Sequence, residues 1–225
     1  MTKNQEIKLE LLKEFYTMEN PVGFCREAYK FLTENEEAMP SVKVENTVKA
    51  ENGIYLVYQN GNSVPFKKGM AKALASDVSG IGVVYDGHAF QVALKDLGEW
   101  PLFRNYEDCP EESPFYKTEC EGLHDWDFVS TTNHIKEIGT DIPRPEGWYI
   151  PTLAVLEVMC FLKKEINEAI KFAGGKPMPD DYHWSSTECN RNIARKVDFS
   201  NGYANSHGKY LSLVVRPVTA FNLEA

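Results

Sequence analysis

Hydrophobic residues recur at helical spacing in two stretches near the start of the chain. Residues 4–18 carry one apolar stripe and residues 22–34 carry another, and Asn20-Pro21 separates them. Apolar residues three and four positions apart mark one face of a helix, and a proline restricts the residue before it to non-helical backbone. The pattern predicts a helical hairpin of about 35 residues. With the polar connector that follows it, this forms an N-terminal helical segment over residues 1–50.

Strand patterns replace helical ones after residue 51. Residues 53–61 predict a strand that ends at Asn60-Gly61, and residues 81–97 predict a β-hairpin that turns at Asp86-Gly87. Both dipeptides favour tight turns between strands. A short helix is expected over residues 67–75. Residues 98–127 are rich in Pro, acidic and aromatic residues without periodicity, which predicts a long loop ordered by burial of its aromatic rings.

The strongest helical stripe lies in the second half of the chain. It predicts a helix that begins after Thr152, a plausible N-cap, and stops at Gly174. A shorter helix is expected over residues 127–138. Three strands are predicted after residue 182, with Val197 and Phe199 on one face. This order of elements predicts an α+β fold for residues 51–225.

Composition narrows the classes of function. The chain has 225 residues and a net charge of -9, which disfavours a nucleic-acid partner because nucleic acids attract basic surfaces. No apolar run reaches the roughly 18 residues of a membrane span, and the charged N-terminus does not resemble a signal peptide. We therefore expect a protein made in the cytoplasm. The five Cys form no CxxC pair, so no disulfide framework or zinc site is indicated.

Three clusters of residues in the sequence are candidates for chemical sites. Residues 183–188, "HWSSTE", lack the G-x-S-x-G pattern of an activated serine, so Trp184 is expected to pack and the hydroxyls to bond to backbone. A sugar platform is one interpretation of the aromatic loop, but scaffold packing is the favoured one. A further set contains acidic residues and a histidine without an established metal spacing: His124, Asp125, Asp127, Asp180 and Asp181. We expect no catalytic residues, no metal and no cofactor.

Residues 182–216 differ from the rest of the chain. Five basic and two acidic residues give this stretch a charge of +3 in an acidic protein. It is also rich in Asn, Ser, Tyr and His. Tyr supplies rigid contact area and Ser and Asn supply adaptable hydrogen bonds, as in binding loops. The stretch predicts either a binding surface or ordinary short polar loops.

Three segments in this order resemble the bacterial C-type-lectin-like domains of the formylglycine-generating-enzyme-like subtype. They are "EGWYIPTLAVLEVM", "YHWSSTE" and "GKYLSLVVRPV", and "GIGVVYDGHAFQVALKDLGEW" resembles the upstream hairpin of the same domains. The resemblance covers residues 51–225 and implies a C-type-lectin-like fold. Within the family, the layout is most similar to the variable proteins of diversity-generating retroelements, such as phage tropism determinants. There, adenine-directed mutagenesis rewrites a C-terminal segment on a fixed scaffold.

The resemblance implies a non-catalytic protein that binds a protein or cell-surface ligand, and a place on a phage virion. Trp184, Ser185, Ser186, Thr187 and Arg216 are scaffold in this interpretation. The implied ligand-binding residues are Cys189, Asn190, Arg191, Asn192, Ile193, Lys196, Asp198, Tyr203, Asn205, Ser206, His207, Leu211 and Leu213.

Two observations bear on this interpretation. Residues 189–193 and 203–207 contain no Lys, Glu, Gln, Met or Trp, the residues that a mutated adenine-adenine-pyrimidine codon does not produce. The calcium-holding segments of the sugar-binding relatives and the paired cysteines of formylglycine-generating enzymes are absent from the sequence. An undiversified structural or adhesin-type domain is the first alternative, and a formylglycine-generating-type enzyme is the second.

Overall fold

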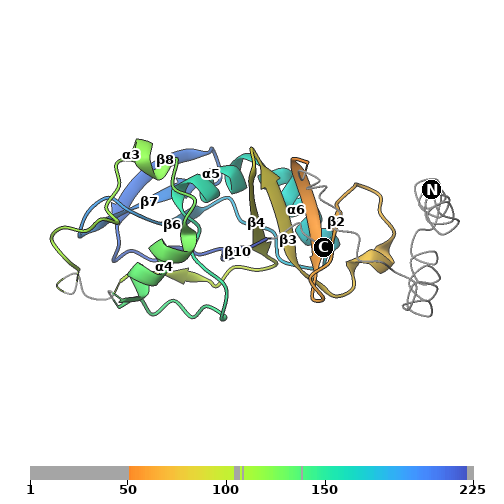
Figure 1. Cartoon of the computed structure of the whole chain (residues 1–225), viewed down its shortest axis with the longest axis horizontal. Coiled ribbons are helices and arrows are strands. Elements are labelled where there is room, and N and C mark those ends of the chain that lie inside the picture. Colours follow the sequence, from red (N-terminus) through yellow and green to blue (C-terminus); the bar gives the residue numbers. More distant parts are fainter. Residues whose placement is uncertain (1–50, 104–106, 108, 138, 222–225) are drawn as a thin grey trace, which may run out of the picture. The chain divides into compact units, whose positions relative to one another are not determined.

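The computed structural model describes residues 51–103, 107, 109–137 and 139–221. Within these residues, helices are mixed with two five-stranded sheets, so the predicted α+β class is confirmed (Figure 1). The predicted helical hairpin and connector of residues 1–50 lie outside the described residues. In the part of the chain that the structure describes, no helix is long and apolar enough to cross a membrane.

The first sheet joins the beginning and the end of the described chain. Its strands are β1 (Gly53–Tyr58), β2 (Ser63–Pro65), β3 (Val78–Tyr85), β4 (His88–Ala93) and β10 (Val218–Ala220), in the order β10-β4-β3-β1-β2. All neighbours are antiparallel. The predicted hairpin turns at Asp86 and Gly87, whose φ angles are 48° and 80°. Positive φ at both turn residues matches the right-handed twist of the two strands, so this prediction is confirmed.

The second sheet carries the segment predicted to bind. Its strands are β5 (Glu99–Trp100), β6 (Tyr182–Glu188), β7 (Ile193–Asp198), β8 (Tyr203–Gly208) and β9 (Leu213–Val214), in the order β5-β9-β6-β7-β8. β6 and β9 run parallel, and the other pairs are antiparallel. The strand predicted around Leu211–Val215 is reduced to the two residues of β9. Among the described strands, β8 lies at the edge of this sheet and pairs with β7 alone.

Five helical elements are described: a 3₁₀ helix η2 (Lys72–Ala75), α3 (Glu119–Gly122), α4 (Phe128–Glu137), α5 (Leu153–Phe161) and α6 (Lys163–Phe172). The helix predicted over residues 127–138 is confirmed as α4. The short helix expected over residues 67–75 is only the 3₁₀ turn η2. The loop expected over residues 98–127 also contains β5 and α3, which its sequence did not predict.

The single long helix predicted after Thr152 is wrong in one respect, because it breaks at Leu162 into α5 and α6. α5 contacts β6 and β7, whereas α6 contacts β1 and β3. One straight helix does not pack against both sheets in this way. The break at Leu162 changes the direction of the chain, so that α5 packs on the second sheet and α6 on the first. The predicted cap is confirmed, since the Thr152 side chain accepts a hydrogen bond from the Val155 N–H.

Two of the four apolar clusters among the described residues contain most of the buried apolar side chains. The larger joins the first sheet to α5, α6 and the inner face of β7, and it buries Val197 of β7 and Phe199, just after β7, as predicted. The smaller surrounds the buried Trp184 indole and includes Ile150 and Val215. In the aromatic loop, Phe103 is buried, while Trp100, Phe115, Tyr116 and Trp126 are half-buried. Tyr106 of that loop lies outside the described residues.

Candidate ligand-binding surface

Strand β6 is the fixed base of the candidate surface. The Trp184 indole N–H donates to the carbonyls of Trp100 (3.0 Å) and Leu211 (3.2 Å). The Ser185 hydroxyl donates to the Arg195 carbonyl (2.9 Å), and the Thr187 hydroxyl accepts from the Leu153 N–H (2.9 Å). Each of these bonds ties β6 to a neighbouring element. The prediction that "WSST" belongs to the core is therefore confirmed.

Arg216 is likewise part of the scaffold. Its side chain is fully buried, with Nε 2.7 Å from an Asp96 carboxylate oxygen. It also donates to the carbonyls of Ala93 (3.0 Å) and Lys176 (2.8 Å). Burial raises the pKa of Asp96 above its usual value and lowers that of Arg216, while their attraction opposes both shifts. The pair fixes the chain as it passes from the second sheet to the first.

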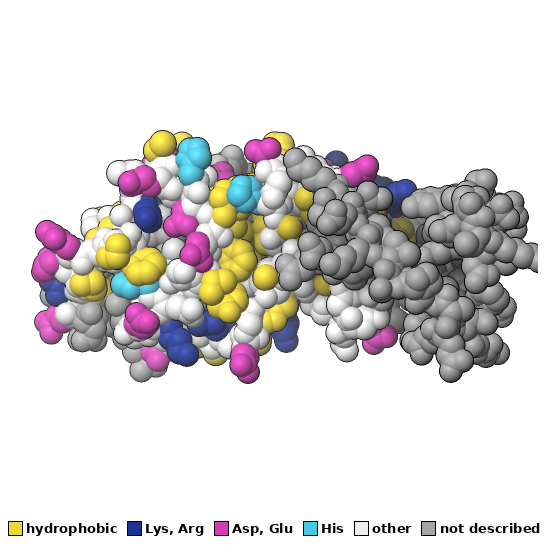
Figure 2. Space-filling view, in the orientation of Figure 1, with side chains coloured by type: hydrophobic (Ala, Val, Ile, Leu, Met, Phe, Trp, Pro, Cys, Tyr) yellow, Lys and Arg dark blue, Asp and Glu magenta, His cyan; other side chains and the backbone are white. Residues whose placement is uncertain are grey.

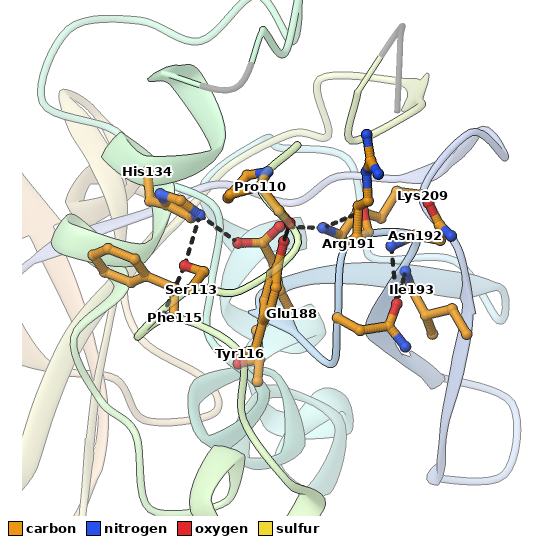
Figure 3. Close-up of polar contacts among 12 residues, drawn as sticks. Pro110, Ser113, Phe115, Tyr116, His134, Glu188, Arg191, Asn192, Ile193 and Lys209 are labelled. Atoms are coloured by element: carbon orange, nitrogen blue, oxygen red, sulfur yellow. Dashed lines mark hydrogen bonds and ion pairs between the residues drawn. The ribbon is translucent and has the colours of Figure 1, made fainter. Parts of the chain in front are cut away.

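A buried ion pair brackets the segment between β6 and β9. Glu188 ends β6 and Lys209 follows β8, and their side chains, each 1% exposed, form a salt bridge (Figure 3). The Lys209 ammonium also donates to the Arg191 carbonyl (3.1 Å) and lies 5.4 Å from the centre of the Tyr116 ring. A buried charge is tolerated when it is paired and hydrogen-bonded. The two ends of the predicted binding segment are thereby held together.

The loop between β6 and β7 is ordered by its own side chains. The Asn190 side-chain oxygen accepts from the N–H groups of Asn192 (2.9 Å) and Ile193 (3.0 Å), as Asn does in tight turns. The Cys189 N–H donates to the Ile193 carbonyl (2.8 Å). Arg191 pairs with the Glu111 carboxylate and donates to the Glu107 carbonyl (3.2 Å). The backbone of this loop is therefore fixed, and its exposed side chains are Asn190 and Asn192.

A serine, a histidine and a glutamate meet beside this loop. The His134 Nε2 lies 3.1 Å from a Glu188 oxygen and 3.4 Å from the Ser113 hydroxyl, and the imidazole stacks on Phe115 (Figure 3). A hydrolytic triad needs the acid on one ring nitrogen and the serine on the other. Here both partners approach the same nitrogen. The arrangement therefore positions Glu188 and does not form a proton relay to Ser113.

The tyrosine in this network is held in its neutral form. The Tyr116 hydroxyl donates to the Pro110 carbonyl (2.5 Å). Burial, reinforced by the charge of Glu188, raises the pKa of Tyr116 to about 12. A phenol that keeps its proton stays a hydrogen-bond donor at neutral pH. It thus adds a stable contact beneath the loop.

Strand β8 presents alternating side chains. Tyr203, Asn205 and His207 are exposed, whereas Ala204 and Ser206 are half-buried on the other face. Successive side chains of a strand point to opposite faces, so the three exposed residues share one face. Tyr203 is 68% exposed, an unusual environment for a large aromatic ring. This row, together with Asn190 and Asn192, is the exposed part of the predicted binding set.

Several predicted contacts occupy other environments. Lys196 is buried at 6% exposure, because its ammonium lies 3.2 Å from the centre of the Tyr182 ring, and it is not an exposed contact as predicted. Leu211 and Leu213 are half-buried and pack against the Trp184 cluster. Asp198 accepts bonds from Ser200 and Asn201 in the β7–β8 turn. The remaining half-buried members are Cys189, Arg191, Ile193 and Ser206.

Two exposed tyrosines were absent from the predicted set. Tyr210 is 68% exposed and Tyr182 is 41% exposed. The sequence held a signal for Tyr210, since it alternates with Leu211 and therefore faces away from the packed side. Tyr182 precedes the buried run of β6 and held no such signal. Both rings enlarge the aromatic content of the surface.

The carboxylates considered as candidate metal ligands make local hydrogen bonds and ion pairs instead. Asp127 accepts from the Ser130 N–H (2.9 Å) at the start of α4, and Asp125 accepts from the Asp127 N–H (3.0 Å). His124 Nδ1 lies 2.8 Å from the Cys120 carbonyl. Lys163 binds Asp180. In the described ranges, no three His, Cys, Asp or Glu side chains are grouped closely enough to hold a metal ion.

Charge is distributed without a single dominant sign on the face that carries α3 and α4. Figure 2 shows Asp and Glu side chains scattered over that face with Lys and Arg among them. Pairs such as Arg195 and Glu119, 3.0 Å apart, contribute to this pattern. Exposed pairs of this kind contribute little stability, about 0–1 kcal/mol. The surface is thus better suited to local contacts than to long-range attraction of a polyanion.

Comparisons with known proteins do not identify a function for this chain. No protein-family model and no curated protein matches this chain. A fimbrial protein from Bacteroides ovatus ATCC 8483 is similar to it at 16% sequence identity and a TM-score of 0.45. The match covers 76% of this chain and 49% of that chain, so this chain spans about half the length of the fimbrial protein.

Proposed function

We propose that this protein is a non-catalytic ligand-binding protein in which a C-type-lectin-like scaffold displays a diversified C-terminal surface. The proposed contacts are exposed side chains on β8 and the β6–β7 loop: Asn190, Asn192, Tyr203, Asn205 and His207. Tyr182 and Tyr210 are added to them because of their exposure. The proposed ligand is a protein or another cell-surface molecule.

The observation that carries this proposal is the separation of fixed and free side chains within one short segment. Trp184, Glu188 and Lys209 are buried, and each makes a hydrogen bond or an ion pair. Tyr203 and His207, on the same sheet, are exposed. Exposed residues that do not pack in the core tolerate substitution, and such changes usually alter the free energy of unfolding by about 0.5 kcal/mol or less. This separation is what a diversified binding surface requires.

The positions of the resembling segments support the lectin-like part of the proposal. Thr152 of the G-W-x-x-P-[ST] segment caps α5, and the W-S-S-T-E segment is the buried strand β6. The closing V-R segment places Arg216 against Asp96. In addition, β10 lies in the same sheet as β1, with β4 and β3 between them, so one sheet contains both ends of the described chain.

The same surface also fits an adhesin-type domain with a fixed ligand. The chemistry of the exposed residues does not differ between the two, since Tyr and Asn serve in both. The discriminating feature is genetic variation at the exposed positions. An enzyme of the formylglycine-generating type is disfavoured because the sequence lacks the paired catalytic cysteines of those enzymes, and because burial raises the pKa of the half-buried Cys189 thiol.

A sequencing experiment tests diversification. The DNA beside the coding region is expected to contain a near-repeat of the codons for residues 182–218 that differs only at adenines. Substitutions in natural isolates are expected at the exposed positions and not at Trp184 or Lys209. A coding region without such a repeat, in isolates that never vary at Tyr203 or His207, would leave the adhesin-type domain as the better interpretation.

A display library tests binding. The exposed contacts are randomised in one library, and in a matched library an equal number of exposed residues is randomised on α4 and α6, including Val129 and Lys171. Both are selected against whole bacterial cells of several strains. Binders that differ in strain choice are expected only from the first library, with unchanged circular dichroism. Equal success of the second library would place the binding surface elsewhere.

A further inference from the structure

Strand β8 leaves one side of the second sheet open. It pairs with β7 along six residues, and no strand of the described part of the chain lies on its other side (Figure 1). An open edge presents unpaired N–H and C=O groups to which another extended chain can bind. The hydrogen-bond register between β7 and β8 determines which backbone groups of β8 point away from β7.

The register identifies the outward groups. The Lys209 N–H donates to the Asn192 carbonyl (2.9 Å), and continuing this antiparallel register directs the hydrogen bonds of Asn205 and His207 toward β7. Ala204, Ser206 and Gly208 therefore direct their backbone groups outward. Among the described residues, the N–H and C=O of Ala204 and the C=O of Ser206 have no hydrogen-bond partner.

Two of the outward N–H groups are covered by exposed side chains. The Ser206 N–H donates to the Asn205 side-chain oxygen (2.7 Å), and the Gly208 N–H donates to His207 Nδ1 (3.1 Å). A carbonyl of an added strand is a stronger and better aligned acceptor than these neighbouring side chains. Because both side chains are exposed, they rotate away without loss of packing. The edge is thus protected but not blocked.

A hollow lies along the open edge. It has a volume of about 400 Å³ and is lined by Glu119, Leu123 and Glu157 together with residues 202–205 of β8 and its turn. Ala204 packs toward α5, so a residue added opposite Ala204 has its side chain on the same face, toward the hollow. The hollow therefore receives one side chain of an added strand.

The two glutamates that line the hollow favour a positively charged side chain. Glu119 is exposed and pairs with Arg195, while Glu157 is half-buried on α5. Burial, with the negative charge of Glu119, raises the pKa of Glu157 above its usual value. A cation placed between the two carboxylates is attracted to both of them and so offsets the burial and the repulsion. An acidic or apolar side chain gains neither contact.

We propose that β8 takes up an extended peptide of a protein ligand as an additional strand, and that the hollow beside Ala204 binds a Lys or Arg side chain of that peptide. Main-chain hydrogen bonds supply affinity and the hollow supplies selectivity. This inference rests on the proposed function for the ligand's being a protein. It adds the conformation and the charge that the ligand brings to the surface.

Synthetic peptides test the inference on the full chain. The probe is the capped heptapeptide Thr-Val-Thr-Lys-Thr-Val-Thr, and two controls replace Lys by Glu or methylate alternate amide nitrogens. Binding is measured by calorimetry and by amide chemical shifts of the ¹⁵N-labelled protein. Shifts are expected at Ala204 and Ser206, and both controls are expected to bind at least about tenfold more weakly.

Three variants are expected to differ in their effect on the affinity for the Lys peptide. Glu157→Gln is expected to weaken the Lys peptide several-fold, while Glu137→Gln, an exposed change at the end of α4, is expected to leave it unchanged. Asn205→Ala removes one of the proposed contacts of the whole protein ligand but uncovers the Ser206 N–H, so the short peptide is expected to bind about two- to threefold more tightly. A gain of affinity is not an effect of damaged folding.

Each contrary result has a defined meaning. Equal binding of the Lys and Glu peptides, or shifts away from β8, overturns the inference. Concentration-dependent self-association that shifts β8 without peptide identifies the edge as an interface between copies of this chain, which also overturns it. If the display library yields strain-specific binders while the peptides do not bind, strand addition fails and the proposed function stands. If the peptides bind while the display library yields no strain-specific binders, strand addition stands and the proposed function fails.

Discussion

At the scale of single residues, aromatic side chains of one sheet have opposite environments. Trp184 is fully buried and donates two hydrogen bonds, whereas Tyr203 is 68% exposed. Removing a buried indole leaves a cavity and two carbonyls without their donor. An exposed ring has neither role. The same residue class therefore belongs to the scaffold at one position and to the candidate surface at another.

This contrast predicts different costs of truncation. Trp184→Ala is expected to lower the free energy of unfolding by about 3–5 kcal/mol, and Tyr203→Ala by about 0.5 kcal/mol or less. Chemical denaturation monitored by circular dichroism measures both. Tyr210→Ala serves as a second exposed control. A large loss for Tyr203→Ala would show that this ring packs in solution and does not belong to a freely variable surface.

His183 predicts a pH dependence of stability. It is fully buried, stacks on Phe199, and has Nδ1 2.9 Å from the Asp181 carbonyl, so Nδ1 carries the proton of the neutral ring. Burial is the main cause that lowers the pKa of His183 to about 4. Between pH 6.5 and pH 4, the His183 imidazole is protonated in the unfolded chain but remains neutral in the folded chain. The free energy of unfolding is expected to fall by about 3 kcal/mol as the pH drops from 6.5 to 4.

The matched variant isolates this contribution. In His183→Asn the side-chain amide replaces the Nδ1–H donor but does not titrate. The difference in unfolding free energy between the original protein and the variant is expected to change through this pH window and to level off below it. Urea denaturation at several pH values measures the difference. A difference independent of pH would show that His183 is solvated or already paired with an acid.

At the scale of elements, the loop between β6 and β7 and strand β8 depend on one buried ion pair. Lys209→Met leaves the buried Glu188 carboxylate without its ammonium partner, and is expected to lower the free energy of unfolding by about 3–5 kcal/mol. Combining it with Glu188→Gln removes the unpaired charge and is expected to restore at least about 2 kcal/mol. A double-mutant cycle by urea denaturation measures the coupling. Additive losses would contradict the bracketing role of this pair.

At the scale of the whole molecule, the lectin-like interpretation predicts independence from calcium. The calcium-holding segments of sugar-binding relatives are missing, and Asp125 and Asp127 already accept backbone N–H groups near α4. A ligand that binds only the folded state raises the melting temperature. Differential scanning calorimetry is therefore expected to give melting temperatures within about 1 °C in calcium and in chelator. A drop of several degrees on chelation would indicate a calcium site.

Much of the fold could be predicted from local sequence. The hairpin at Asp86-Gly87, the cap at Thr152 and helix α4 follow from turn chemistry and periodicity, which act over a few residues. The burial of Trp184 and Val197 was also predictable, because large apolar side chains on a patterned strand favour the core. In these cases the local preference and the tertiary environment agree.

Only the tertiary structure decided which polar residues are buried and which are free. Glu188 and Lys209 are separated by 21 residues, and no local pattern shows that they pair. Lys196 alternates correctly for exposure, yet the neighbouring Tyr182 ring covers it. The break at Leu162 depends on two sheets that α5 and α6 each contact. Short-range preferences along the chain determine the elements, whereas the environment of a charge depends on partners that only folding brings near.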